Sequence, residues 1–276
     1  MAGPADGIGM GTTAAVWIRR LAACGAALVL VTSGGCFRLE LSVELRADGS
    51  GVQRLRVRVD ESVLDRAQRA AAVLATADGG PPDPTRIFDA RAVAAELEDA
   101  GLTVQEHAVD TIGSERRTDV AAGFADLAQL RASPLGGGAA EWFVLPGRNP
   151  GGLRLVLYPQ GHEAWREARE RAAQLRAVPD DVRHEFFRAQ RDRIAGLDVA
   201  FRIVLPGDVD YVSAGVEHVD ARTVRLGFRA ADLQSAEDVV MALAPRLEVE
   251  FDGRGVRWPQ DAADPGVRPR AADRDR

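Results

Sequence analysis

The chain has 276 residues, of which 46% are hydrophobic and 28% are charged, and these proportions are typical of a globular protein. Its formal net charge of −6 argues against a nucleic-acid partner, because nucleic-acid-binding domains usually carry a basic stripe. All 35 basic residues are arginine, since the sequence contains no lysine. This composition excludes a P-loop lysine, a Schiff-base lysine and a serine–lysine catalytic pair.

The N-terminal segment has the order of residues that is typical of a secretory signal peptide. Arg19 and Arg20 form a cationic n-region, an apolar run follows at residues 21–31, and small residues follow at 32–35. The apolar run falls within the range of about 7–15 residues expected of a signal h-region. It is well short of the roughly 20 residues that a membrane-spanning helix needs. We therefore predict that residues 1–35 are a signal peptide and that the domain after it is exported.

Cys36 follows the small residues directly, and this position resembles the lipobox of bacterial lipoproteins. In that family the thiol receives a diacylglyceryl group, so the resemblance implies lipid attachment at Cys36 and a membrane anchor. Ser33 departs from the pattern, because lipoboxes usually carry leucine three residues before the cysteine. An ordinary cleaved signal that leaves a free Cys36 and an uncleaved anchor are the alternatives. Cys24 lies within the predicted signal, so the mature chain can form no internal disulfide.

Residues 38–60 predict a β-hairpin, because apolar residues alternate with charged ones on both sides of a glycine-rich turn. The apolar side chains are expected to share a buried face, with the turn at residues 47–51. The opposite face carries an arginine row that could bind anions, but acids on the same face favour a solvated surface of mixed charge. The expected cross-strand pairs on that face are Glu44 with Arg54 and Glu40 with Arg58.

The rest of the chain alternates short strands with helices and predicts an α+β fold with mainly antiparallel sheets. A helical hairpin is expected as an insertion at about residues 162–195. The exported domain is expected to span residues 36–252, and the Gly-, Pro- and Asp-rich composition of residues 253–276 predicts a disordered tail without a transmembrane segment. The predicted helices are 61–77, 89–100, 125–130, 162–178, 180–195 and 231–243, and the predicted strands are 102–109, 115–122, 140–145, 152–158, 197–205, 212–218, 223–228 and 247–251.

The four histidines do not form a recognisable catalytic or metal-binding motif. His184 begins a sequence similar to HExxH, but Arg188 replaces the second histidine and cannot ligate zinc. His107 and His218 each follow a glutamate within a weak internal repeat and could meet if two repeats pack face to face. Exposed histidines at strand ends are the simpler alternative. We predict no catalytic residue, no metal and no cofactor, which favours a binding or structural role.

The stretch that starts at Cys36 resembles the LppM-like family of bacterial lipoproteins, which begin with a cysteine, a strand, an Asp-Gly type turn and a second strand. The helical hairpin and the lack of a C-terminal membrane segment depart from that family. The resemblance implies an α+β domain at the cell envelope, with roles in envelope or glycolipid biology and no catalytic residues to carry over. It covers residues 36–130 and 197–230, with similar stretches at 101–104, 124–127, 201–206 and 223–226.

These observations predict a membrane-anchored extracytoplasmic lipoprotein that acts as a non-catalytic binding module. Its expected ligand is an envelope lipid, glycolipid or protein, held through apolar area with arginines at the rim. An envelope hydrolase with a site of scattered acids and histidines is one alternative, and a structural subunit that docks through residues 162–195 is another. A large apolar pocket would favour lipid binding. Convergent polar groups with shifted pKa values would favour the hydrolase, and an exposed apolar patch would favour the docking subunit.

Overall fold

The computed structural model describes residues 36–74, 83–136 and 139–266, so the predicted signal peptide with Arg19 and Arg20 and residues 267–276 lie outside the described residues. The strands are β1 Phe37–Leu45, β2 Gly51–Asp60, β3 Thr103–Ile112, β4 Glu115–Phe124, β5 Glu141–Pro146, β6 Gly152–Tyr158, β7 Leu197–Val204, β8 Val209–Val212, β9 Val216–Asp220, β10 Thr223–Arg229 and β11 Leu247–Asp252. The helices are α2 Glu61–Leu74, α3 Ala90–Asp99, α4 Leu127–Ala132, α5 His162–Leu175, α6 Asp180–Arg193 and α7 Ala236–Leu243, with short 3-10 helices at Arg86–Phe88, Pro134–Gly136 and Ala230–Asp232.

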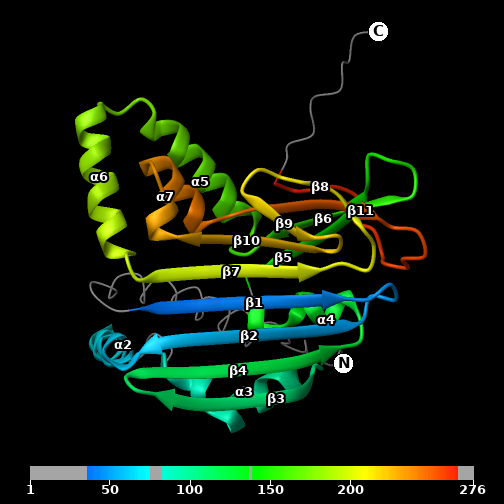
Figure 1. The fold of residues 1–276 in the computed structure, drawn as a ribbon, viewed down its shortest axis with the longest axis horizontal. Coiled ribbons are helices and arrows are strands. Elements are labelled where there is room, and N and C mark those ends of the chain that lie inside the picture. The colour runs from blue at the N-terminus through cyan, green and yellow to red at the C-terminus, as the bar shows by residue number, and fades with distance from the viewer. Residues whose placement is uncertain (1–35, 75–82, 137–138, 267–276) are drawn as a thin grey trace, which may run out of the picture.

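The described strands form two sheets that pack against each other (Figure 1). The larger has seven strands in the order β3-β4-β2-β1-β7-β10-β9, and the smaller has four in the order β5-β6-β11-β8. Among the described strand pairs, only β1 and β7 run parallel, and they lie within the larger sheet. The predicted α+β class with mainly antiparallel sheets is confirmed.

The N-terminal hairpin of β1 and β2 has its predicted faces but not its predicted register. Glu44 lies opposite Val52, a shift of two residues from the expected pairing with Arg54. The turn causes this shift, because it spans residues 46–50 and places Gly49 in the left-handed region, with φ +90°. A two-residue shift preserves the alternation of side chains, so the apolar residues still face the core and the arginines face outward.

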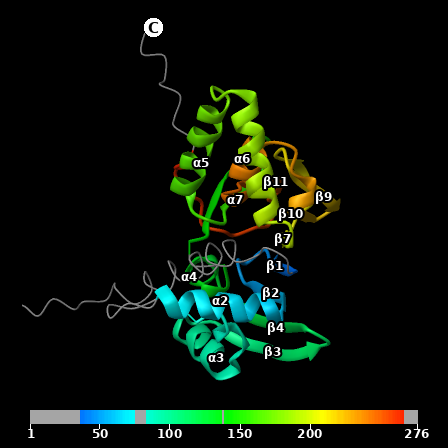
Figure 2. The same cartoon turned by 90° about the vertical axis from the view of Figure 1, so that its left-hand side faces the viewer.

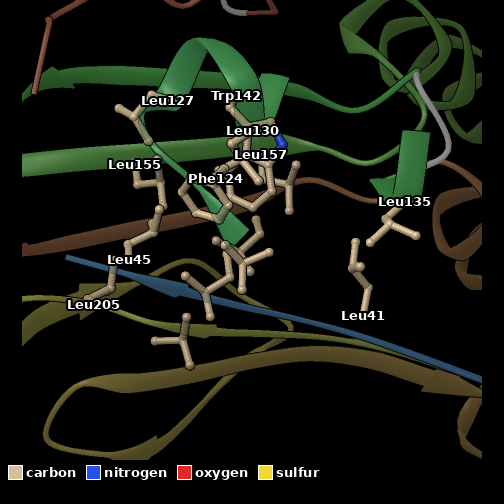
Figure 3. Packing of buried hydrophobic residues seen from close by; sticks show 14 of the residues in the cluster. Leu41, Leu45, Phe124, Leu127, Leu130, Leu135, Trp142, Leu155, Leu157 and Leu205 are labelled. Carbon is tan, nitrogen blue, oxygen red and sulfur yellow. The ribbon is translucent and has the colours of Figure 1, made fainter. Parts of the chain in front are cut away.

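One core fills the space between the two sheets. Figure 3 shows Leu45 from β1, Phe124 from β4, Trp142 from β5 and Leu155 from β6 within it, and each is buried. Gly51 enters the same core without a side chain, because a Cβ there would lie 2.4 Å from the ring of Phe124. Buried apolar residues of both sheets thus form one shared core.

The smaller sheet and several helices cover the inner face of the larger sheet, and its outer face is left open by the described residues (Figure 2). α5 and α6 form the helical hairpin that the sequence predicts. Ala168 and Ala172 of α5 pack on Val240 of α7 and on Ala244 at its C-terminal end, whereas α6 has no buried residue. α6 packs on the domain through its partly buried Phe186 and Phe187, so both helices of the hairpin contact it.

Two strands, β8 and β9, replace the single strand that the sequence predicts at residues 212–218. β8 pairs with β11 in the smaller sheet, whereas β9 pairs with β10 in the larger one. Gly215 lies between them with φ +83°, a backbone conformation that interrupts a strand. The chain crosses from the smaller sheet to the larger one at this point. The prediction of one continuous strand over residues 212–218 is therefore wrong.

The predicted disorder of residues 253–276 is wrong for residues 253–266, which pack on the domain. Trp258 is 6% exposed, and its ring centroid lies 5.5 Å from that of Phe251. Its Nε1 donates a hydrogen bond to the backbone oxygen of Arg46 at 2.8 Å. Single side chains such as Trp258 hold this segment on the domain. The overall composition, which is rich in Gly, Pro and Asp, does not indicate such contacts.

Candidate functional site

Cys36 directly precedes β1 and has an exposed, free thiol. Its backbone oxygen accepts a hydrogen bond from the backbone N–H of Asp60 at 3.1 Å, which extends the β1–β2 ladder by one residue. Phe37 already belongs to β1, and its N–H donates to the backbone oxygen of Gly196 at 2.8 Å. Cys36 is therefore joined to an interior strand of the larger sheet without a linker.

The outer face of that sheet carries a row of three arginines close to Cys36. Arg117 of β4 lies opposite Arg58 of β2, and Arg58 lies opposite Arg38 of β1. Asp198 of β7 is the next residue in this row. Figure 1 shows the four strands side by side, and neighbouring strands are about 4.8 Å apart. We call Arg117, Arg58 and Arg38 the arginine row.

Farther from Cys36 along β2, acidic residues neutralise Arg54 and Arg56 on the same face. Asp119 lies 3.2 Å from Arg54 and 2.9 Å from Arg56. Glu106 lies 3.0 Å from Arg54. This part of the face is the solvated surface of mixed charge that the sequence favours.

The arginine row is less well neutralised than Arg54 and Arg56. Arg117 forms an ion pair with Glu115. The side chain of Arg38 is 58% exposed, and its nearest carboxylate, Asp198, is 4.0 Å away. Arg58 has no ion pair or side-chain hydrogen bond within the described part of the chain. Because like charges directly opposite each other destabilise a sheet, stability alone does not account for this row.

The histidines that the sequence singles out do not come together. His107 on β3 and His218 on β9 lie on opposite edge strands of the larger sheet, about 29 Å apart at the usual strand spacing. The hairpin of β3 and β4 and the hairpin of β9 and β10 form opposite ends of the sheet and do not face each other. The alternative in which the two histidines meet is therefore wrong. His107 Nε2 lies 3.2 Å from the Ile87 backbone oxygen and 3.1 Å from Thr118 Oγ1.

His162 and Glu141 form a close pair at the start of α5. His162 Nδ1 lies 2.5 Å from Glu141 Oε2, and the His162 backbone N–H donates to the same oxygen at 3.3 Å. The carboxylate thereby satisfies a free N–H of the first helical turn and meets the positive end of the helix dipole. The pair caps the helix, and the sequence does not reveal it because the capping acid comes from β5.

A buried polar cluster joins the smaller sheet to the C-terminal segment. The Tyr158 hydroxyl donates to Asp264 Oδ1 at 2.6 Å and accepts from Arg246 Nε at 2.9 Å. Arg246 Nη2 lies 2.8 Å from Asp264 Oδ2 and 2.6 Å from Glu248 Oε2. Sequence reasoning missed this cluster because Asp264 lies in the predicted tail, and no local pattern connects it to Tyr158.

The protonation of this cluster follows from its contacts. Burial raises the pKa of Tyr158, and the hydrogen bond to Asp264 raises it further, so the phenol stays protonated. Burial also acts to raise the pKa of Asp264, but hydrogen bonds from Tyr158 and Arg246 outweigh burial and hold the pKa below its ordinary value of 3.8. Asp264 is therefore ionised and neutralises Arg246, as in a structural ion-pair network.

An open hollow of about 490 Å³ lies between α6 and the start of α7. His184, Arg183 and Phe187 contribute to its lining, together with Glu237. Arg183 lies 3.6 Å from Glu237 and also pairs with Asp180, so charges of both signs meet there. This polar lining differs from the mostly apolar pocket that would favour a buried lipid.

Exposed apolar side chains are scattered over the described surface. On α6 only Val182 is a large exposed hydrophobic residue, so the described part of the helical hairpin presents no apolar docking patch. Within residues 36–74, 83–136 and 139–266, no helix is long and apolar enough to cross a membrane. The same residues contain no group of three or more His, Cys, Asp or Glu side chains that could hold a metal ion.

Neither a protein-family model nor a curated protein matches the chain. Among solved structures, the chain is similar to the folded domain of LppM from Mycobacterium tuberculosis, which was determined by NMR. The match covers 79% of this chain and 91% of that chain, with 9% sequence identity and a TM-score of 0.39. This is a loose structural match only.

Proposed function

We propose that this protein is a lipoprotein anchored on the extracytoplasmic side of the cell envelope and that its domain is a non-catalytic binding module. The observation that carries the proposal is the position of Cys36, which follows a signal-like segment and directly precedes β1 with an exposed thiol. A diacylglyceryl group on this thiol supplies two acyl chains, and two chains anchor a protein stably where one does not.

The open outer face of the larger sheet supports the binding role. The core between the sheets is filled by side chains, so we infer recognition at the surface, with less apolar contact area than the sequence predicts. Arginine guanidinium groups suit anionic partners, because their parallel N–H donors match carboxylate and phosphate oxygens. We infer an envelope partner with anionic groups.

A non-catalytic role is supported by the separation of the titratable groups. His107 and His218 lie on opposite edges of the sheet, His184 lies on α6, and His162 caps α5. Hydrolysis needs a nucleophile and an acid–base pair in a defined geometry. The docking alternative has little support because α6 exposes Val182 alone among its large hydrophobic residues.

Substitution of Cys36 tests the anchoring. In the producing cell, Cys36→Ser is expected to release the protein from the membrane fraction or to leave a longer, unprocessed precursor. Cys24→Ser is the matched control, because Cys24 lies in the predicted signal and its loss leaves anchoring intact. Fractionation and electrophoretic migration provide the measurement. If Cys36→Ser fractionates and migrates like the wild type, the proposed anchor is wrong.

A further inference from the structure

The lack of a linker at Cys36 decides which end of the domain faces the bilayer, and this step rests on the proposed function. A lipidated Cys36 is held at the level of the lipid headgroups, and β1 begins at the next residue. At about 3.3 Å per strand residue, Arg38 stands about 7 Å along β1 from Cys36, whereas Leu45 stands about 30 Å away. The Cys36 end of the larger sheet is thus at the membrane surface.

Cys36 and Arg38 lie on the same side of β1. The hydrogen bond between Cys36 and Asp60 continues the strand ladder, and alternate residues of a strand share a face. Arg58 and Arg117 lie beside Arg38 in the same register position of their strands. The arginine row is therefore the first row of outward-facing side chains beyond Cys36 and Asp60.

The row is flanked by two carboxylates, because Asp110 of β3 lies opposite Arg117 and Asp198 of β7 lies opposite Arg38. Glu115 pairs with Arg117. Asp198 lies 3.2 Å from Arg229 but 4.0 Å from Arg38. The guanidinium group of Arg38 is consequently only weakly engaged, and its exposed side chain can meet a partner from outside the chain.

Arg58, at the middle of the row, is exposed and has no ion pair among the described residues. Asp60 lies two residues along the same strand, but its carboxylate is already bound. It accepts a hydrogen bond from the Ser62 backbone N–H at 2.9 Å and another from Ser114 Oγ at 2.9 Å. Arg58 therefore retains its donors for an anion.

We propose that Arg38 and Arg58 bind phosphate groups of the lipid leaflet that holds the Cys36 anchor. Guanidinium groups form paired hydrogen bonds with phosphate oxygens, and their long apolar stems let the charged ends reach the headgroups. The phosphate charge offsets the repulsion between the two opposed arginines. The contact sets the orientation of the domain, with β1 directed away from the bilayer and the turn at residues 46–50 far from it.

Chemical modification of the arginines in the anchored protein tests this contact. The mature protein is purified from membranes and placed in vesicles of phosphatidylcholine and phosphatidylglycerol, or in vesicles of digalactosyldiacylglycerol, which carries no phosphate. Phenylglyoxal then modifies accessible arginines, and mass spectrometry measures the rate at each residue. We expect Arg38 and Arg58 to react about tenfold more slowly in the phospholipid vesicles, the effect of one charge-assisted hydrogen bond.

Arg222 is the matched control for these rates. Its side chain is 57% exposed, close to the 58% of Arg38, and it lies next to β10 at the end of the sheet opposite Cys36. It forms an ion pair with Asp208 at 3.0 Å. Arg222 is expected to react at the same rate in both kinds of vesicle.

Two results would overturn the phosphate contact. Equal, fast modification of Arg58 in both lipids would mean that it meets no headgroup. Equal, slow modification in both would mean that the surface shields it without phosphate binding. Failure of the proposed function looks different, because the N-terminal peptide would then lack the acyl mass and the protein would not insert into either vesicle.

Discussion

Replacement of Trp258 by alanine is expected to destabilise the domain by about 3–5 kcal/mol. The indole is buried, packs on Phe251 and donates a hydrogen bond to the Arg46 backbone oxygen at 2.8 Å. About 200 Å² of buried aromatic surface at about 25 cal/mol per Å² gives about 5 kcal/mol. This figure is an upper bound, because the unfolded chain already buries part of that surface.

Urea unfolding of the mature protein, followed by far-UV circular dichroism, measures this loss as a lower transition midpoint at an unchanged slope. Trp258→Phe is the matched control, because it retains an aromatic ring and removes the indole N–H, and we expect it to cost about 1–2 kcal/mol. A loss below about 1 kcal/mol for Trp258→Ala, the size of an ordinary surface change, would refute the packing of residues 253–266.

Asp264→Asn is expected to lower the free energy of unfolding above pH 3.8, the ordinary pKa of the carboxyl group, because the ionised form is the one held by Tyr158 and Arg246. The difference in the free energy of unfolding between the variant and the wild type shrinks as the pH falls below that value, because the unfolded state binds the proton first. Urea titrations at several pH values measure this difference, and a constant difference would contradict the expectation. Gly51→Ala is expected to cost about 2–3 kcal/mol, since its Cβ would lie 2.0 Å from the Glu44 backbone oxygen and 2.4 Å from the Phe124 ring. An unchanged melting temperature would argue against the observed register. The mature protein is expected to show no turnover of esterase, phosphatase, glycosidase or peptidase substrates. Alanine variants of His107, His184 and His218 are assayed beside it, and turnover that one of these substitutions abolishes would support the hydrolase alternative.

The hairpin of β1 and β2 shows what a local pattern can and cannot predict. Alternation along residues 38–60 predicted both strands and both faces, because a period of two in hydrophobicity reports burial directly. The register depends on which glycine takes the turn. Gly49 adopts the left-handed conformation, whereas Gly51 is needed in the core beside Phe124, and only tertiary packing distinguishes the two.

That two-residue shift also explains why the arginine row could not be predicted. The expected register set Glu40 opposite Arg58, which would have formed an ion pair. In the structure Arg58 lies opposite Arg38, and Arg117 joins them from a strand far along the chain. The prediction for Cys36, by contrast, rests on the order of residues that precede it, and that order is purely local.

Contacts between distant segments account for the remaining differences. The parallel pairing of β1 with β7 sets Phe37 opposite Leu197, and no local periodicity connects these two residues. Trp258 and Asp264 secure the C-terminal segment as single side chains within a polar stretch. Their partners are Arg46 and Tyr158, which come from other parts of the chain, so composition alone predicted disorder there.

The mass of the N-terminal peptide of the mature, membrane-extracted protein tests the central claim most directly. If the protein is a lipoprotein, this peptide begins at Cys36 and carries the added mass of a diacylglyceryl group, with or without a further acyl chain on its amino group. A mature N-terminus at any other residue, or an unmodified Cys36, would contradict the account.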